Sequence, residues 1–223
     1  MQFISPNIVE LDPENGEHVK AVSNLHINLL PESILSKLGY LFLSKFYYAK
    51  LPKDRLIDVF LFKHEGIYIG FLSCTNSPFT FLQEGRKKYF FLISVILLIS
   101  VILKPARIKI IVKPFGTEAS DAKIREELNL LKQQFGNDNL GESLSLGIID
   151  KYRNVIDLPS KLKIPHLMMT HLFSHFRNQN KSCFFGMAKR KNLMALWLYK
   201  QYNGIFSIDK NEKSESVFIR WNC

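Results

Sequence analysis

The stretch "DVFLFKHEGIYIGFLSC", residues 58–74, decides the fold. Two arms rich in aromatic and β-branched residues flank the tetrapeptide "KHEG", in which Gly66 can adopt the backbone conformation that a tight turn requires. The stretch therefore predicts an antiparallel β-hairpin. Because a hairpin needs further sheet partners to be stable, the remaining segments are expected to extend a sheet around it.

Upstream of the hairpin, the sequence predicts one strand and two helices. The "IVEL" segment, residues 8–11, is typical of a short strand, and residues 17–30 carry apolar side chains every third or fourth position, as in an amphipathic helix. A second helix is expected over residues 31–51, with Pro31 in its first turn and an end marked by Pro52.

Downstream, strands and helices alternate. In chain order we expect a helix at 120–136 capped by Ser120, a strand at 143–150, a helix from Lys163, a strand at 181–189, a helix opened by Asn192, and strands at 204–208 and 216–222. The 223 residues contain no internal repeat and no linker rich in Pro, Gly or Ser. A single α/β domain is therefore predicted.

The most apolar stretch is "YFFLISVILLISVILKP", residues 89–105. As a helix, residues 89–103 would measure about 22 Å, which is shorter than the roughly 30 Å core of a bilayer. Basic residues flank both ends, so no charge asymmetry would orient a membrane span. We expect a helix buried on nearly all sides; a strand and a membrane contact remain open alternatives.

Charge and cysteine content restrict the class of protein. The formal net charge of +10 favours an anionic partner, but Lys and Arg are spread along the chain, so nucleic-acid binding is not expected. Three widely spaced cysteines favour reduced thiols over a disulfide framework or a zinc site. The acidic N-terminal segment lacks the pattern of a signal peptide, and a cytoplasmic location is predicted.

Two blocks of sequence resemble the GCN5-related N-acetyltransferase (GNAT) superfamily. The first is "LPESILSKLGYLFLSKFYYAKL" followed by "IYIGFLSC", and the second is "SLGIIDKYR", "KIPHLMMTHLF" and "KNLMALWLYKQYNGI". The resemblance covers most of the chain. It implies an α/β fold, a single domain over 1–223, with a mixed, mostly antiparallel sheet splayed at its centre, helices on both faces, and a helical insertion around 82–141.

The resemblance also implies acetyl-coenzyme A as acyl donor, bound where the strands of "SLGIID" and "CFFGMA" part. Backbone groups of Ile148 and Ile149 would pair with the pantetheine amides, and the phosphates would meet the start of the next helix. The chain departs from the family at this point. "NVIDLPSKL", residues 154–162, intervenes before the phosphate loop, and the positions that best fit its two glycines hold Lys163 and Pro165. Arg153, Lys161 and Lys163 are therefore the candidate phosphate contacts, or else part of a solvated charge run.

By resemblance, Tyr199 is the general acid that protonates the departing thiolate, although a tyrosine packed on an amphipathic helix is an equal alternative. Asn192 matches a residue that contacts the cofactor, and it also suits a helix N-cap. The general base stays open among three candidates: Glu84, Glu142 and His26.

His171 and His175 stand one helical turn apart, but no HExxH frame and no third ligand accompany them. They are expected to be structural, and no metal is expected.

The predicted function is transfer of an acetyl (acyl) group from acetyl-coenzyme A to the primary amine of a small acceptor. The family branch suggests an amino sugar or a sugar nucleotide as that acceptor. The alternative is a non-catalytic GNAT-like binding or scaffold protein, for which association with a membrane surface is left open. For residues 89–105, packing within the domain or in a homodimer is favoured over contact with lipid.

Overall fold

The computed structural model of the chain describes residues 5, 7–108, 122–207 and 216–223. Within them, seven strands form one sheet in the order β1-β2-β3-β4-β7-β9-β8, and β5 and β6 form a separate hairpin. The strands are β1 (Ile8–Glu10), β2 (Asp58–His64), β3 (Ile67–Thr75), β4 (Leu140–Ile148), β5 (Ile156–Asp157), β6 (Leu162–Lys163), β7 (Cys183–Lys189), β8 (Ile205–Ser207) and β9 (Ser216–Asn222). Neighbours in the main sheet are antiparallel, except for the parallel pair β4 and β7.

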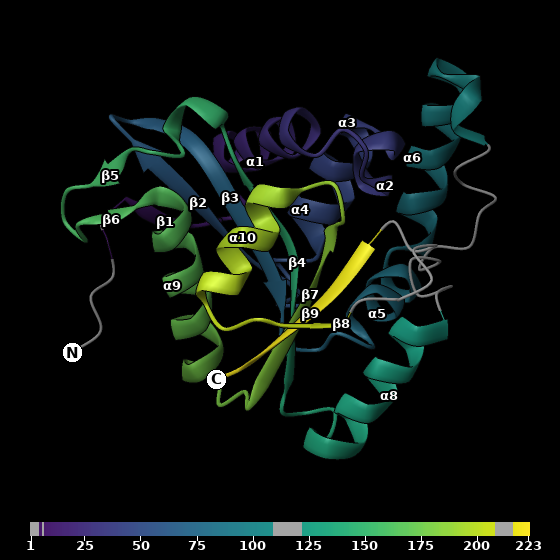
Figure 1. Cartoon of the computed structure of the whole chain (residues 1–223). Helices are drawn as coiled ribbons and strands as arrows, with labels where there is room; N and C mark the ends of the chain where they lie inside the picture. The colour runs from purple at the N-terminus through teal and green to yellow at the C-terminus, as the bar shows by residue number, and fades with distance from the viewer. Residues whose placement is uncertain (1–4, 6, 109–121, 208–215) are drawn as a thin grey trace.

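Helices cover both faces of this sheet. They are α1 (Gly16–Leu29), α2 (Ile34–Leu38), α3 (Tyr40–Phe42), α4 (Tyr48–Lys50), α5 (Phe81–Lys88), α6 (Phe90–Leu103), α8 (Ala122–Phe135), α9 (Ile164–Asn178) and α10 (Leu193–Gln201). Figure 1 shows α9 and α10 in front of the sheet, α1 to α4 behind its upper part, α8 at the lower right and α6 at the right edge.

Side chains that alternate between the two faces of each strand explain the two layers of helices. In β2, Phe60 and Phe62 belong to the core beneath α9 and α10, whereas Val59 and Leu61 belong to the core beneath α1 to α4. Because successive strand residues point to opposite faces, one hydrophobic strand supports both cores. The predicted fold class, a mostly antiparallel α/β sheet with helices on both faces, is confirmed.

The helix expected over residues 31–51 is instead broken into short pieces. It begins after Ser33, whose side chain accepts a hydrogen bond from the Ser36 N–H at 3.0 Å, and it stops at Gly39. Gly39 has a φ of 99°, a conformation that side-chain-bearing residues rarely adopt and that an α-helix cannot continue through. Residues 43–47 then form a π-helical turn before α4.

The apolar run 89–105 forms α6, so the helical interpretation is correct, but the expected burial is wrong. Only Ile96 and Ser100 of α6 are buried, while Phe91 is 81% exposed and Ile102 is 70% exposed. In chain order, the run comes between β3 and β4, together with α5 and α8. In space, α6 lies at the margin of the sheet (Figure 1). Among the described residues, no helix combines the length and the apolar character needed to cross a membrane.

A substitution at Gly141 in β4 would test how tightly α9 packs on the sheet. A β-carbon added at Gly141 would collide with the ring of Phe176, which is fully buried and stacks on Phe184. We expect Gly141→Ala to lower the free energy of unfolding by about 1–3 kcal/mol, measured by urea titration. Gly16→Ala is the control, because a β-carbon there meets no atom within 4 Å. Equal stabilities for the two variants would contradict the packing.

Candidate functional site

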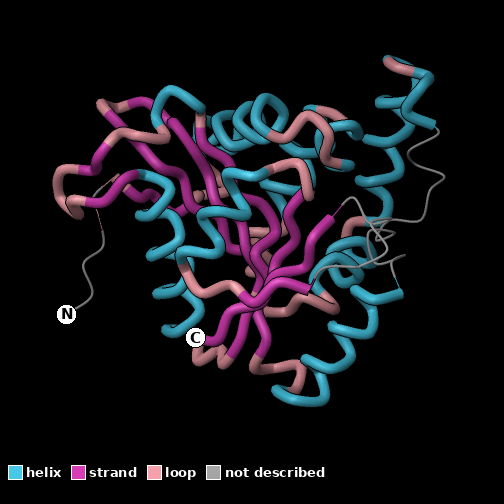
Figure 2. The backbone as a smooth tube through the Cα atoms, in the orientation of Figure 1, coloured by secondary structure: helices cyan, strands magenta, loops and turns pink. Residues whose placement is uncertain are grey.

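The centre of the sheet contains a gap in strand pairing. The parallel strands β4 and β7 pair from Leu140 with Cys183 as far as Ser143 with Gly186. Beyond that point, β4 continues to Ile148 and β7 continues to Lys189 without pairing with each other. Figure 2 shows the strands fanning apart from the lower part of the sheet. We call residues 144–148 of β4 and 187–189 of β7, with the space between them, the wedge.

A β-bulge lies where the wedge begins. Across β3 and β4, Ser73 pairs with Ser145 but Cys74 pairs with Ser143, so Leu144 is an additional residue in β4. An additional residue bends its strand and increases its twist. Because β7 stays paired with β9 over its whole length, the divergence comes from the bend in β4. The sequence carries no signal for this bulge, since residues 143–150 resemble a regular strand.

Backbone groups of β4 face the wedge at alternate residues. The N–H of Ile149 donates to the carbonyl of Ile69 at 2.9 Å, and the carbonyl of Ile149 accepts from the Tyr152 N–H at 2.9 Å. Both backbone groups of Ile149 are therefore already hydrogen-bonded within the protein, contrary to the expectation that they would pair with the cofactor. Because hydrogen-bonding direction alternates along a strand, Ile148 and Leu146 direct their backbone groups into the wedge.

Tyr199 lies on α10, close to the start of the wedge. Its ring packs edge-on against Trp221 with centroids 5.2 Å apart, and a β-carbon added at Gly186 would lie 3.7 Å from the same Trp221 ring. Within the described part of the chain, no hydrogen bond is found for the Tyr199 hydroxyl. Burial raises the pKa of Tyr199 to about 12, so the phenol stays protonated at neutral pH.

The neighbouring phenol on the same segment has a different role. The Tyr202 hydroxyl donates to the carbonyl of His166 at 2.9 Å and lies 3.2 Å from the Thr170 hydroxyl. Tyr202 therefore connects the end of α10 to α9. Of these two tyrosines, Tyr202 is the one whose hydroxyl is held by hydrogen bonds among the described residues.

Only one of the three candidate bases lies on a strand that borders the wedge. His26 is fully buried, with Nδ1 2.6 Å from the Tyr48 hydroxyl and Nε2 3.0 Å from the Ser33 hydroxyl, and burial lowers its pKa to about 4. Glu84 lies on α5, outside the wedge. Glu142 is on β4 immediately before Ser143, where pairing with β7 ends. Of the three candidates, Glu142 is therefore the one on a strand that borders the wedge.

The expected phosphate-binding region folds as a hairpin. Residues 154–163 form β5, a turn that contains Lys161, and β6, which continues directly into α9. Asp157 anchors the hairpin: its buried carboxylate accepts from Asn7 Nδ2 at 2.6 Å, the Ser5 hydroxyl at 3.1 Å and the Ser160 N–H at 2.9 Å. The substitution of a glycine loop by "NVIDLPSKL" therefore reflects a different local structure.

The candidate phosphate contacts are distributed around this hairpin. Arg153 forms an ion pair with Asp150 at 2.6 Å, and Lys163 donates to Asn154 Oδ1 at 3.3 Å. At the start of α9, the N–H of Ile164 already donates to the Val155 carbonyl at 3.0 Å. The first turn thus offers an anion fewer free N–H groups than an uncapped helix would.

Asn192 acts as a helix cap. Its side-chain oxygen accepts from the Ala195 N–H at 3.2 Å, and α10 begins at the next residue, Leu193. The N-cap alternative therefore describes the residue as it stands, and a cofactor contact would be an additional role.

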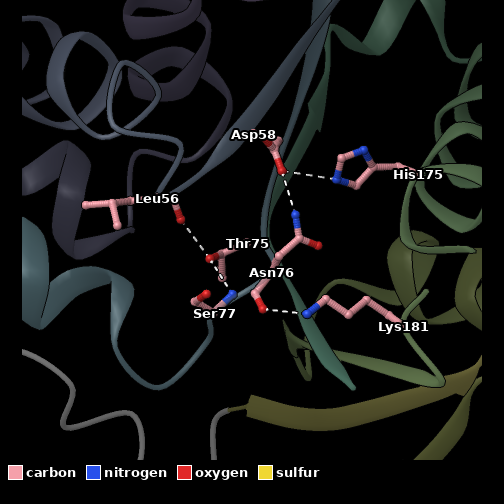
Figure 3. A network of polar contacts seen from close by, with 7 residues as sticks. All are labelled: Leu56, Asp58, Thr75, Asn76, Ser77, His175 and Lys181. Carbon is pink, nitrogen blue, oxygen red and sulfur yellow. Dashed lines mark hydrogen bonds and ion pairs between the residues drawn. The ribbon is translucent and has the colours of Figure 1, made fainter. Parts of the chain in front are cut away.

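A polar network joins β2, β3 and α9 in the paired part of the sheet (Figure 3). One oxygen of Asp58 accepts from Asn76 Nδ2 at 3.0 Å and lies 3.1 Å from His175 Nε2. Lys181 extends the network by donating to the Asn76 carbonyl at 2.8 Å. Asp58, His175 and the thiol of Cys74 lie within 4.8 Å of one another, as ligands of a metal can. Because the carboxylate already has two partners, we interpret the group as a clamp between α9 and the sheet.

Comparison with solved structures identifies the fold. The GNAT domain of S. lividans PAT matches with a TM-score of 0.53 at 7% identity, over 97% of this chain and 89% of that one. Drosophila melanogaster polyamine N-acetyltransferase, which forms N-acetylagmatine, matches with 0.52 at 13% identity, over 97% and 100%.

A third match is the C-terminal condensation domain of Ebony, solved in complex with β-alanyl-dopamine, with a TM-score of 0.55 at 10% identity over 97% and 98%. No family model and no curated protein matches the sequence. The protein therefore has the fold of the GCN5-related N-acetyltransferases.

Proposed function

We propose that the protein is an N-acetyltransferase of the GNAT superfamily that transfers an acetyl (acyl) group from acetyl-coenzyme A to a primary amine. The observation that carries this proposal is the wedge, with the backbone of Leu146 and Ile148 directed into it beside a bulge at Leu144. Pantetheine contains two amides in an extended chain, and such a chain can pair with an open strand as a peptide does.

The chemistry would proceed by direct transfer. The acceptor nitrogen attacks the thioester carbonyl, the C–N bond forms, and collapse of the tetrahedral intermediate breaks the C–S bond. Backbone N–H groups at the start of the wedge would stabilise the oxyanion. Glu142 would accept the proton that the amine loses, and the thiolate of coenzyme A would leave beside Tyr199.

The pKa of Tyr199 defines what this phenol can contribute. Burial raises the pKa of Tyr199 to about 12, above the roughly 8.5 of a free thiol, so complete transfer of its proton to a free thiolate would be uphill. Tyr199 is therefore better suited to donate a hydrogen bond to the developing thiolate than to transfer its proton completely.

Tyr199→Phe should lower kcat about 10- to 100-fold while leaving the Kd for acetyl-coenzyme A within about two-fold, because the lost hydrogen bond forms only as charge develops. The measurement is steady-state release of coenzyme A with an amine that supports turnover. Tyr202→Phe is the matched control, since that hydroxyl is bonded to His166 and Thr170. Equal rates for wild type and Tyr199→Phe would remove Tyr199 from the mechanism.

At the phosphate end, we propose that Lys161 and Lys163 act as point charges in place of a glycine loop, with Arg153 released from Asp150 to join them. The acceptor we propose is a small primary amine, and an amino sugar or sugar nucleotide is suggested by the resemblance alone. The polyamine acetyltransferase of similar fold supports a small amine in general.

The second candidate function is a non-catalytic protein that has kept the fold. The hairpin in place of the phosphate loop favours it, because β6 continues directly into α9 and the Ile164 N–H is occupied. The two functions differ in one property. Only the enzyme requires acetyl-coenzyme A to enter the wedge.

A further inference from the structure

The outer face of α6 is an exposed apolar surface. Phe91, Val95, Leu98 and Ile102 are 81%, 38%, 62% and 70% exposed. Their spacing of four, three and four residues places them within about 60° of one another around a helix that turns 100° per residue. The opposite face, which includes Ile96, is packed on the core beneath α1 to α4. We call these four residues the α6 stripe.

Both ends of the α6 stripe carry positive charge. Arg86 and Lys87 are exposed at the end of α5, and Lys104 is exposed directly after α6. Lys88, at the same end, is paired with Asp54 at 2.7 Å. In the sequence, residues 85–117 contain seven Lys and Arg and no Asp or Glu. The apolar stripe is thus bordered by cations, and the nearest acids in the sequence, Glu84 and Glu118, lie just outside this segment.

We propose that the α6 stripe docks the protein on a membrane surface that contains anionic lipids. The 14 residues of α6 measure about 21 Å, too short to span a bilayer but long enough to lie in its interface. An interfacial helix needs a polar side facing away from lipid, and here the domain behind Ile96 occupies that side. Arg86, Lys87 and Lys104 would meet the anionic headgroups.

A second copy of the chain fits the same face poorly. In an antiparallel pair of α6 helices, Arg86 and Lys87 of one copy would approach Lys104 of the other, and in a parallel pair each cation would face its own equivalent. Either arrangement brings like charges together without an acid from residues 85–117. The footprint of one helix, roughly 21 Å by 10 Å, also falls well below the roughly 800 Å² per partner of a stable interface.

Flotation with lipid vesicles tests the proposal, using the full chain and vesicles of phosphatidylcholine with or without phosphatidylglycerol. We expect the wild type to float with the anionic vesicles, less so in high salt, and not with the neutral ones. Leu98→Glu should lower the bound fraction at least about ten-fold, because it removes a buried apolar contact and adds repulsion. Lys87→Gln with Lys104→Gln should lower binding about 25-fold at low salt, roughly five-fold for each cation.

Leu158→Glu is the matched control. Leu158 is 84% exposed in the turn between β5 and β6, on the other side of the molecule from α6 (Figure 1), and its substitution should not change flotation. Circular dichroism melts would establish that all variants fold. The proposal is overturned if the wild type binds neither vesicle, if it binds both equally, or if Leu98→Glu and Leu158→Glu bind alike. It is also overturned if light scattering detects a dimer that Leu98→Glu abolishes.

Discussion

Replacement of Glu142 by Gln should lower kcat about 100- to 10,000-fold, the range expected when a general base is removed. Glu142 is the candidate base on β4, one residue before the last β4–β7 pair, Ser143 with Gly186, and Gln keeps its size without accepting a proton. The measurement is the pH profile of coenzyme A release with a primary amine that the wild type acetylates. The variant should lose the limb of the profile that reports deprotonation of the base.

Glu84→Gln is the control for this prediction. Glu84 is a carboxylate on α5, away from β4, and its removal should leave the rate within about two-fold. If Glu142→Gln retained the wild-type rate and the wild-type pH profile, the base would have to be a bound water or another group.

Acid should destabilise the protein strongly between pH 6.5 and pH 4. Burial lowers the pKa of His26 and of His171 from 6.5 to about 4, and the nearby His175 also lowers that of His171. Between pH 6.5 and pH 4, these histidines are therefore protonated in the unfolded chain but not in the folded chain. The free energy of unfolding, which is highest above pH 6.5, falls as the pH falls towards 4. Each histidine should cost about 3 kcal/mol over this interval.

Urea titrations at several pH values would measure this effect. The two histidines together account for about 6 kcal/mol, which is comparable with the whole stability of many domains. His171→Leu should remove about half of the pH dependence. It should also preserve stability at pH 7, because His171 Nε2 is buried without a hydrogen-bond partner among the described residues. An unchanged pH dependence in this variant would contradict the assignment.

The order of strands and helices could be predicted because each element carries a local signal. The hairpin at 58–74 has its turn glycine, α1 has its apolar period and α9 has Pro165 in its first turn. The prediction of one helix over 31–51 was wrong at Gly39, because the sequence pattern of apolar residues does not show that this glycine has a positive φ. The helix expected at 120–136 appears as α8 from Ala122, and its proposed cap, Ser120, lies outside the described residues.

Burial and the candidate site depend on partners that a single segment does not identify. For α6, composition indicated an apolar environment, but whether that environment is the core, a second copy or lipid is a property of the surrounding surface. At the wedge, the pairing of Ile148 with the cofactor, which the resemblance implies, stays a prediction, and the backbone of Ile148 faces the wedge. Leu146, and not Ile149, is the second residue whose backbone faces the wedge, because Ile149 is hydrogen-bonded to Ile69. Only the assembled sheet defines this register.

Hydrogen exchange of the β4 amides, with and without acetyl-coenzyme A, tests the central claim most directly. If the cofactor pairs with the open strand, the N–H groups of Leu146 and Ile148 should exchange more slowly in its presence. The N–H of Ile149 should not change, because it is already bonded to Ile69. Binding should occur with a Kd below about 1 mM. Unchanged exchange at Leu146 and Ile148 in millimolar acetyl-coenzyme A would contradict the enzyme and leave the non-catalytic alternative.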